Sequence, residues 1–233
     1  MPIECSVYWA RPGDARPEHR RMFTGAELAR ATAYRRAIDT ARFVVGCALS
    51  RLALGELLSL PPGDVPLLRD CADCGQPHGR PRLADDSAHV SVSHSGEHVV
   101  VAVTRAAPLG VDIEQHKPQS VDLAEAVLTE TEQAGFSALP KTERVAGFFR
   151  YWTRKEAVLK ATGDGLRVPM TAIEVSAPHS PAALLRFDGR PTLRLRLADL
   201  SVDAEHSAAI AVETTDPPTM THVDGRVLLA AVS

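Results

Sequence analysis

Two carboxylates stand two residues apart in the segment Gly110-Val-Asp-Ile-Glu114. The alternation of apolar and acidic residues in this segment predicts a strand. Val111 and Ile113 would lie on its buried face, and Asp112 and Glu114 would lie together on the other face. Side chains at positions i and i+2 of a strand point the same way, roughly 6 to 7 Å apart at Cα, so these two carboxylates can converge on one cation. An isolated pair of carboxylates at this spacing more often belongs to a solvent-exposed strand face. A cation site at Asp112 and Glu114 therefore needs support from a second segment.

A third carboxylate lies in residues 151–160, which have the pattern of a helix. The helical period places Trp152, Glu156 and Lys160 along one ridge, with Lys155 beside it. An ordinary surface ion pair would also explain Glu156 and Lys160, since such a pair stabilises a helix by only about 0.2 to 0.5 kcal/mol. This stretch and the residues just before it are the most aromatic part of a chain with 5% aromatic residues. We therefore expect a packed helix whose charged ridge faces a cleft.

A third segment, Ser91-Val-Ser-His-Ser-Gly96, follows Gly79-Arg-Pro81 along the chain. Arg80, Ser93 and His94 carry donors suited to phosphate oxygens, and the glycine permits a tight turn. His94 could equally be a catalytic base for a serine nucleophile, but the chain has no Gly-x-Ser-x-Gly elbow. The donors therefore favour an anionic ligand.

The elements that must position these segments include both helices and strands. Helical patterns cover residues 25–36, 39–54, 121–139 and 143–162, and strand patterns cover residues 89–94, 99–104, 110–114, 173–175, 184–187, 193–197 and 208–212. A boundary near Pro108 divides the chain into residues 1–107 and 108–233. The two parts show a weak internal similarity at an offset of about 109 positions, which aligns Arg51 with Lys160. We predict an α+β fold of two similar halves related by a pseudo-twofold axis, with the active site in the cleft between them.

The bulk properties exclude several classes of function. The 233 residues carry a net charge of −3, with 45% hydrophobic and 24% charged residues, so the chain is an ordinary globular protein with no general attraction to nucleic acid. The N-terminal residues include Glu4 and lack the apolar core of a secretory signal, and no apolar run approaches the roughly 18 residues of a membrane span. We expect a cytoplasmic protein without membrane contact.

The cysteines leave one metal question open. Cys71-Ala-Asp-Cys74 with His78 resembles half of a zinc-binding motif. Cys5 and Cys47 are isolated and do not form the second pair that a structural zinc ion needs. Reduced thiols are therefore the simpler expectation for a cytoplasmic chain.

Taken in order, the motifs resemble those of the Sfp-type 4'-phosphopantetheinyl transferases. The motifs are Gly79-Arg-Pro81, Ser91-Val-Ser-His-Ser-Gly96, Gly110-Val-Asp-Ile-Glu114 and Trp152-Thr-Arg-Lys-Glu-Ala-Val-Leu-Lys160, followed by Gly163-Asp-Gly-Leu166. The helical residues 39–51, with Ala41-Arg42, also look like the N-terminal half of that family. The resemblance covers most of the chain and leaves out the residues after about 215.

The resemblance implies an enzyme that moves phosphopantetheine from coenzyme A to a serine of an apo acyl or peptidyl carrier protein and releases 3',5'-ADP, with Mg²⁺. It implies a monomer with coenzyme A in the cleft between two halves. Asp112, Glu114 and Glu156 match the magnesium ligands of the family. Glu156 also matches the residue proposed to deprotonate the carrier serine, and Lys160 matches the lysine thought to stabilise the departing 3',5'-ADP.

The resemblance also implies cofactor-binding residues. Ser93 and His94 match ligands of the coenzyme A phosphates, and Arg80 matches a basic residue near the 3'-phosphate, where the family often has a lysine. Lys155 and Arg42 belong to the matching segments and are further candidates. Because acceptor recognition cannot be located in a single sequence, fatty-acid, polyketide and nonribosomal-peptide carrier proteins all stay open as acceptors.

Two other classes of function would use parts of the same constellation. A magnesium-dependent phosphohydrolase would cut coenzyme A or a nucleotide with the same carboxylates and with water as acceptor. A non-catalytic module would bind coenzyme A or a carrier protein, but the presence of all three carboxylates and Lys160 argues against a degenerate site.

Overall fold

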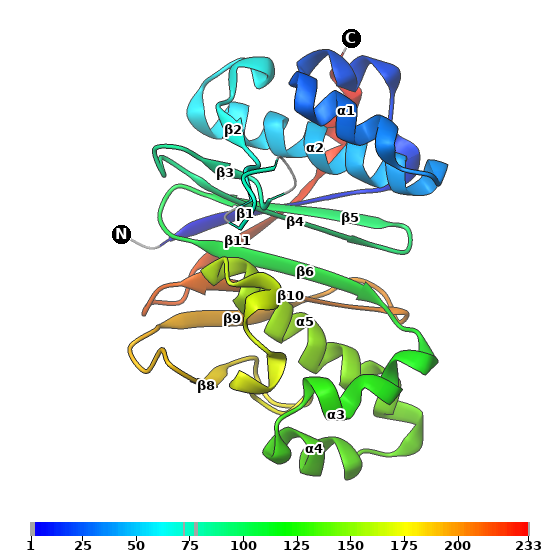
Figure 1. Cartoon of the computed structure of the whole chain (residues 1–233), viewed down its shortest axis with the longest axis vertical. Helices are drawn as coiled ribbons and strands as arrows, with labels where there is room; N and C mark the ends of the chain where they lie inside the picture. The colour runs from blue at the N-terminus through cyan, green and yellow to red at the C-terminus, as the bar shows by residue number, and fades with distance from the viewer. Residues whose placement is uncertain (1–2, 72, 77–78, 233) are drawn as a thin grey trace. The chain divides into compact units, whose positions relative to one another are not determined.

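The computed structural model describes residues 3–71, 73–76 and 79–232. The chain forms two compact units, unit 1 (Met1–Ala107 with Thr219–Ser233) and unit 2 (Pro108–Pro218). Each unit packs a long helix on a sheet, so the predicted α+β class is confirmed (Figure 1). None of the helices among the described residues has both the length and the apolar character needed to cross a membrane.

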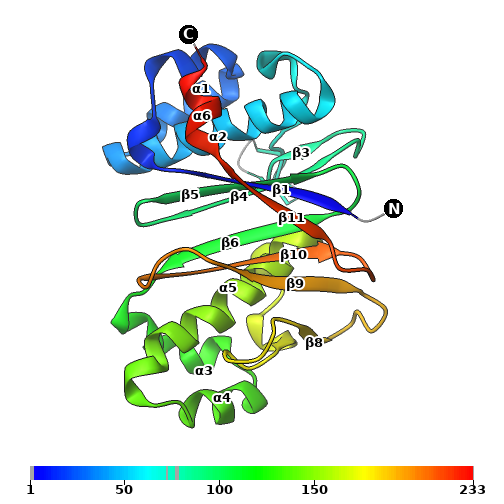
Figure 2. The same ribbon diagram turned by 180° about the vertical axis from the view of Figure 1, so that it is seen from behind.

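Unit 1 is built on a four-stranded sheet with the order β11-β1-β5-β4. The hairpin predicted at residues 89–104 is confirmed, and β1 continues it in antiparallel pairing with β5 (Figure 2). The helix α2 packs on β5 and β4, and the core lies between them because apolar residues of α2 repeat at helical spacing. The elements are β1 (Glu4–Ala10), α1 (Gly25–Ala33), α2 (Ala37–Leu58), β2 (Leu67–Leu68), β3 (Arg82–Leu83), β4 (His89–Ser95), β5 (His98–Thr104), β11 (Thr219–Asp224) and α6 (Gly225–Ala230).

Unit 2 has a three-stranded antiparallel sheet with the order β6-β10-β9 and a small second sheet of β7 and β8. The helix α5 packs on β6 and β10, and Gly163 ends it in the left-handed conformation with φ 74°, as its position in the sequence predicts. The elements are β6 (Leu109–Gln115), α3 (Ala124–Val127), α4 (Glu130–Ser137), α5 (Arg144–Thr162), β7 (Ile173–Val175), β8 (Leu184–Phe187), β9 (Leu195–Leu200) and β10 (His206–Glu213).

The prediction of one helix over residues 121–139 is wrong, because α3 ends at Val127 and a separate helix α4 begins at Glu130. Thr129 caps α4: its side chain accepts from the Glu132 amide, and the Glu132 side chain accepts from the Thr129 amide at 2.8 Å. This reciprocal capping box satisfies two amides that a continuous helix would have bonded internally. The helical pattern of the sequence therefore contains a break that apolar spacing alone does not show.

The last segment of the chain packs in unit 1, although residues 108–233 were predicted to form one half. The strand β11 pairs in parallel with β1, and α6 packs against α2. The ring nitrogen Nε2 of the buried His19 bonds the Leu229 carbonyl oxygen at 3.0 Å. These contacts join residues more than 160 positions apart, which local sequence patterns do not reveal.

Each unit contains a buried ion pair of the same design. In unit 1, Glu27 completes the capping box of α1 with Thr24, and its Oε2 lies 2.8 Å from Nη2 of Arg51 on α2. In unit 2, Glu132 of the Thr129 capping box lies 2.5 Å from Nζ of Lys155 on α5. All four charged side chains are at most 3% exposed. The equivalent of Arg51 in this arrangement is Lys155, whereas the offset of 109 aligned Arg51 with Lys160.

The pKa of Glu27 shows how such a pair is maintained. Burial opposes ionisation of this carboxyl group, but the Thr24 amide and the Arg51 guanidinium outweigh it, so the pKa of Glu27 lies below its usual value. The ion pair therefore stays charged inside unit 1 and fixes α1 against α2.

Candidate functional site

The carboxylate face of β6 lies against α5. A Cβ atom at Gly110 would overlap the Ala157 carbonyl oxygen and the Ala161 amide nitrogen, so only glycine lets the helix backbone come this close. Asp112 points to the same face two residues later and lies opposite Ala209 of β10. The predicted strand is confirmed, but both of its faces are buried from Leu109 to Ile113, because α5 covers the face that carries Asp112.

Lys160 and Asp112 form the centre of the site. Nζ of Lys160 lies 2.7 Å from Oδ1 of Asp112 and donates to the Val111 carbonyl oxygen at 3.1 Å. The Asp112 side chain is 4% exposed and that of Lys160 is 29% exposed. The close approach at Gly110 therefore places this lysine directly over the strand that carries the predicted metal ligands.

Glu156 lies one helical turn before Lys160 and faces the same group of charges. Burial raises the pKa of Glu156, the negative charges of Asp112 and Glu114 raise it further, and Lys160 opposes them. Lys160 contacts Asp112, and the charges of Asp112, Glu114 and Lys160 all act on Glu156, so we call Asp112, Glu114, Glu156 and Lys160 the carboxylate cluster.

The donor set of the carboxylate cluster suits a hard divalent cation. It offers only oxygen ligands from three carboxylates, and one lysine leaves the cluster with an excess of negative charge. Mg²⁺ prefers carboxylate and water oxygens and binds through one or two carboxylates plus phosphate oxygens. The residues present therefore fit the ion that the sequence predicts.

Lys155 has surroundings that differ from the prediction. Its Nζ lies 2.5 Å from Oε2 of Glu132 and donates to the carbonyl oxygens of Val127 at 2.7 Å and Met170 at 3.0 Å. Burial lowers the pKa of Lys155, and Glu132 opposes that shift. An ammonium group has three donors, and here each has an acceptor inside unit 2. This environment argues against a direct contact with a cofactor and gives Lys155 a structural role.

Three of the predicted cofactor-binding residues, Arg42, Ser93 and His94, lie near the turn of the β4–β5 hairpin. Arg42 on α2 donates to the Gly96 carbonyl oxygen from Nε at 3.2 Å and from Nη2 at 2.6 Å, and its Nη1 lies 3.1 Å from Asp39. His94 is exposed and follows Val92, which faces α2. Arg42 therefore fixes the turn that carries His94.

Ser93 and His94 do not share a face, because neighbouring side chains of a strand point to opposite sides of the sheet. Ser93 is 8% exposed and pairs with Val100 in the register of β4 and β5. His94 pairs with Val99 and is exposed. The hairpin offers the two predicted ligands in different directions.

A basic cluster that the sequence did not single out lies around Phe43 in unit 1. The guanidinium groups of Arg30 and Arg69 stand over the Phe43 ring at 5.5 Å and 5.8 Å from its centroid. The Arg69 carbonyl accepts from the Gly79 amide at 2.6 Å, which ties the cluster to the segment of the exposed Arg80. No motif marks Arg69, because its contacts depend on tertiary packing.

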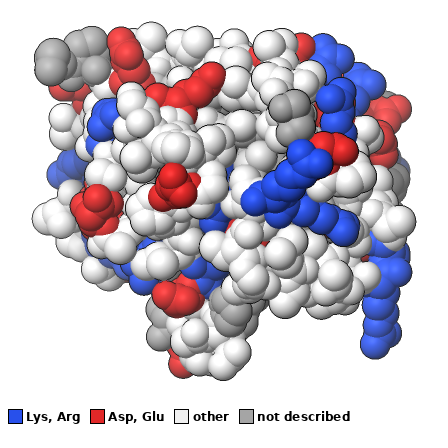
Figure 3. Space-filling model, turned by 90° about the horizontal axis from the view of Figure 1, so that it is seen from above, with Lys and Arg blue, Asp and Glu red and all other residues white. Residues whose placement is uncertain are grey.

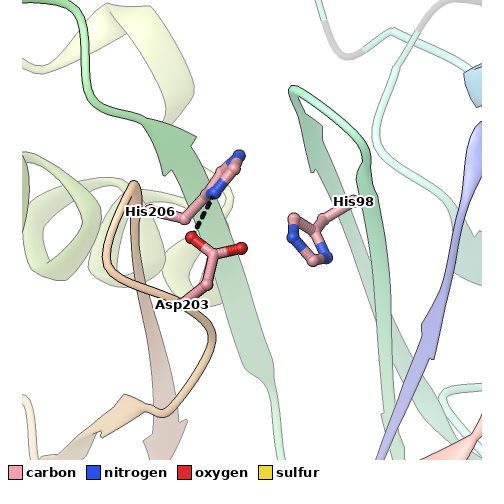
Figure 4. A group of neighbouring side chains, drawn as sticks. All are labelled: His98, Asp203 and His206. Atoms are coloured by element: carbon pink, nitrogen blue, oxygen red, sulfur yellow. Dashed lines mark hydrogen bonds and ion pairs between the residues drawn. The ribbon is translucent and has the colours of Figure 1, made fainter.

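A polar cluster in unit 2 was also missed by the sequence patterns. His116 Nε2 lies 2.9 Å from Oγ of Ser207, which faces Glu114 in the register of β6 and β10. His206 Nδ1 bonds Asp203 at 2.8 Å (Figure 4). Burial lowers the pKa of His116, and the nearby His206 lowers it further. This cluster extends the polar surface of β6 beyond the carboxylate cluster.

The four cysteines are free thiols. Amide donors of Asp73 and Cys74 lower the pKa of Cys71, whereas burial raises the pKa of Cys47 to about 12. His78 lies outside the described residues, so the half zinc motif stays a prediction.

Both signs of charge occur on the surface, as the small net charge of the chain suggests. The face drawn in Figure 3 carries acidic and basic side chains, and the basic ones gather toward one edge of that view. Neither sign covers the face. Binding of an anionic ligand therefore depends on local clusters, as the net charge of −3 predicts.

Comparison with known proteins places the site in a family. The model of the 4'-phosphopantetheinyl transferase superfamily matches residues 108–213, which contain the whole carboxylate cluster. The chain is 35% identical over 161 residues to the 4'-phosphopantetheinyl transferase HetI of Nostoc sp. strain PCC 7120, a match that covers 68% of this chain and 67% of the relative.

Two further relatives extend the match along the chain. The 4'-phosphopantetheinyl transferase psf-1 of Bacillus pumilus is 32% identical over 186 residues, with 80% of this chain and 70% of the relative covered. A 4'-phosphopantetheinyl transferase of Bacillus subtilis is 28% identical over 213 residues, covering 90% of this chain and 92% of the relative. The chain belongs to the 4'-phosphopantetheinyl transferase superfamily, which confirms the resemblance found in the motifs.

Proposed function

We propose that this protein is a 4'-phosphopantetheinyl transferase, a holo-[carrier protein] synthase that moves phosphopantetheine from coenzyme A to a serine of an apo carrier protein and releases 3',5'-ADP. The observation that carries the proposal is the carboxylate cluster, in which Lys160 pairs with Asp112 and the charges of Asp112 and Glu114 act on Glu156. The cluster lies in the segment that the family model matches, and its donors suit charge that develops on a pyrophosphate.

Asp112, Glu114 and Glu156 would hold Mg²⁺. When bound, the ion would neutralise charge on the pyrophosphate oxygens of coenzyme A. Burial raises the pKa of Glu156, and the charges of Asp112 and Glu114 raise it further. A cation among the three carboxylates would relieve that repulsion, which supports this assignment.

Glu156 is proposed as the base that takes the proton of the carrier serine. A glutamate with a raised pKa is a stronger proton acceptor than an exposed one. The serine oxygen then attacks the phosphorus next to pantetheine, and the bond between that phosphorus and the bridging oxygen breaks. Lys160 stabilises the negative charge left on 3',5'-ADP. Its ammonium group is already held at the site by Asp112.

Unit 1 is proposed to bind the anionic parts of coenzyme A. His94 and Arg80 are exposed donors for phosphate, Ser93 offers a further hydroxyl, and Arg42 holds the hairpin turn in place. We propose that the active site lies in a cleft between two similar halves, which correspond to residues 1–107 and 108–233 apart from the tail in unit 1. The ion pair of the same design in each unit supports the duplication.

The remaining parts of the proposal concern the setting of the reaction. We propose a cytoplasmic monomer that acts on carrier proteins of fatty-acid, polyketide or nonribosomal-peptide synthesis and binds neither nucleic acid nor membranes. The four free cysteines suit a reducing compartment, and the net charge of −3 gives no general attraction to polyanions.

Product analysis tests the proposal against hydrolysis. Apo carrier protein is incubated with this protein, coenzyme A and Mg²⁺, with a chelator in a parallel sample, and its intact mass is measured. We expect a gain of one phosphopantetheine on a single serine, absent with the chelator. Free phosphopantetheine with unmodified carrier proteins would instead indicate a phosphohydrolase that uses the same carboxylates.

A further inference from the structure

A groove of about 1020 Å³ runs along β8, β9 and the loop between them in unit 2. Among the described residues that line it, none belongs to the carboxylate cluster. Its apolar part includes Leu184, Phe187 and Leu193. Its charged part consists of four arginines and one acid, namely Arg186, Arg190, Arg194, Arg196 and Asp188. The groove is therefore both apolar and strongly basic, in contrast to the net negative charge of the whole chain.

Two of these arginines have acidic partners and two do not. Arg186 pairs with Asp188 and Glu174, and Arg190 pairs with Asp164. Arg194 and Arg196 bond only carbonyl oxygens, namely those of Pro191, Leu193 and Thr215, and no carboxylate among the described residues pairs with either arginine. These two positive charges are exposed and are available for an acidic partner.

The distribution of these groups fits a protein surface better than a single phosphate. The arginines are spread over β8, β9 and the loop between these strands, and Leu185 beside them is 60% exposed. Exposed apolar side chains surrounded by arginine are typical of protein–protein interfaces, where arginine is enriched. The complementary surface would be acidic with an apolar centre.

The groove is joined to the helix that carries the proposed catalytic residues. Nη2 of Arg190 lies 2.6 Å from Oδ1 of Asp164, which follows the end of α5 at Thr162. Six positions of α5 separate Glu156 from Thr162, which corresponds to about 9 Å at the rise of an α-helix, and Asp164 follows two residues later. A small protein of 100 residues has a radius of gyration of about 13 Å, so a domain docked on the groove can reach Glu156.

We propose that this groove docks the acceptor carrier protein through an acidic face of that protein with apolar residues at its centre. The inference rests on the proposed function and adds the place on unit 2 where the acceptor binds. Arg194 and Arg196 supply the attraction and orientation, and Leu185 supplies an apolar anchor.

The test measures binding and transfer separately. Binding of apo carrier protein without coenzyme A is measured by biolayer interferometry, with one fatty-acid and one peptidyl carrier protein as probes. Transfer kinetics then give KM values for the carrier protein and for coenzyme A. The variants are Arg194→Glu, Arg196→Glu, the milder Arg194→Gln and Leu185→Ser. Lys141→Glu is the matched control, because it reverses an exposed charge of unit 2 outside the groove. Thermal unfolding midpoints check that each variant is folded.

We expect the charge reversals to weaken carrier binding and to raise KM for the carrier about fivefold to tenfold, with KM for coenzyme A unchanged. Arg194→Gln and Leu185→Ser should have smaller effects in the same direction, and Lys141→Glu should behave as the wild type. The wild-type affinity should also fall with added salt. Carrier binding by all folded groove variants within twofold of the wild type would overturn the docking proposal, and so would a rise in KM for coenzyme A alone. Salt-sensitive carrier binding without any transfer would contradict the proposed function and leave the docking site standing.

Discussion

At the scale of single residues, Glu156 combines a functional position with a conflict of charge. Burial and the charges of Asp112 and Glu114 raise its pKa above the usual value. Perturbed carboxyl groups of this kind concentrate at functional sites, where a base needs a pKa closer to the working pH. The same perturbation has a consequence for stability.

Glu156→Gln should raise the thermal unfolding midpoint at neutral pH. Because the pKa of Glu156 is higher in the folded state, its contribution to stability is fully present below its unfolded pKa and is lost as the pH rises through the folded pKa. The glutamine side chain is neutral at every pH, so the variant does not lose this stability as the pH rises. Differential scanning fluorimetry of both proteins from pH 4 to 8 checks this, and the difference should disappear at the acidic end. Glu125→Gln, on an exposed position, is the control. A lower midpoint for Glu156→Gln at pH 7 would contradict the charge conflict.

His94→Ala should raise KM for coenzyme A about tenfold and reduce kcat much less. The exposed imidazole is proposed to bind a phosphate group, and a charge-assisted hydrogen bond of about 1.5 kcal/mol corresponds to such a change. Steady-state kinetics with varied coenzyme A measure it, with His179→Ala on an exposed position of unit 2 as the control. An unchanged KM would remove His94 from the phosphate site.

The residue types of the candidate site could be predicted, but not all of their surroundings. The strand that carries Asp112 and Glu114 and the helix that carries Glu156 and Lys160 were predicted correctly, because both spacings follow from backbone geometry. The burial of Lys155 could not be predicted. Whether a lysine on a helix faces the core depends on the element that packs there, and here that element carries Glu132.

At the scale of elements, the contact between β6 and α5 determines the geometry of the carboxylate cluster. Gly110→Ala should destabilise the protein by about 1 to 3 kcal/mol and reduce transfer strongly, because the added Cβ overlaps backbone atoms of α5 that no side-chain rotation can move away. Urea unfolding and transfer assays measure the two effects. Gly13→Ala is the control, since a Cβ there meets no atom within 4 Å. Normal stability with normal transfer would show that α5 does not depend on this close approach.

The Lys155–Glu132 pair should be a structural element of unit 2. Lys155→Ala should reduce the free energy of unfolding by about 3 to 5 kcal/mol, because it leaves Glu132 charged and buried. Combining Lys155→Met with Glu132→Gln should restore part of the loss, since neither charge then remains. Chemical unfolding gives the free energies. A stable Lys155→Ala protein with a raised KM for coenzyme A would instead support the predicted contact with the cofactor.

The long strongly patterned elements were predictable, and the interruptions were not. The β4–β5 hairpin, α2 and α5 follow directly from apolar periodicity and turn residues. The break between α3 and α4 depends on the Thr129 capping box, whose residues also suit a continuous helix. Local patterns specify where apolar side chains must lie, and capping decides where a helix begins.

At the scale of the whole molecule, the class of fold follows from the sequence, but the pairing of distant segments does not. The strands β1 and β11 are short and stand at opposite ends of the chain, so no local signal connects them. The parallel pairing of β11 explains why the tail belongs to unit 1. Each unit contains a buried ion pair between a helix-capping glutamate and a cation of the long helix, and the sequence patterns do not show either pair.

The central claim is that the carboxylate cluster performs the transfer. It is tested most directly by the intact mass of an apo carrier protein after incubation with coenzyme A, Mg²⁺ and either the wild type or Glu156→Gln, together with calorimetric titration of coenzyme A into both proteins. We predict that the wild type adds one phosphopantetheine, whereas Glu156→Gln binds coenzyme A and adds none. Full transfer by folded Glu156→Gln would contradict the account.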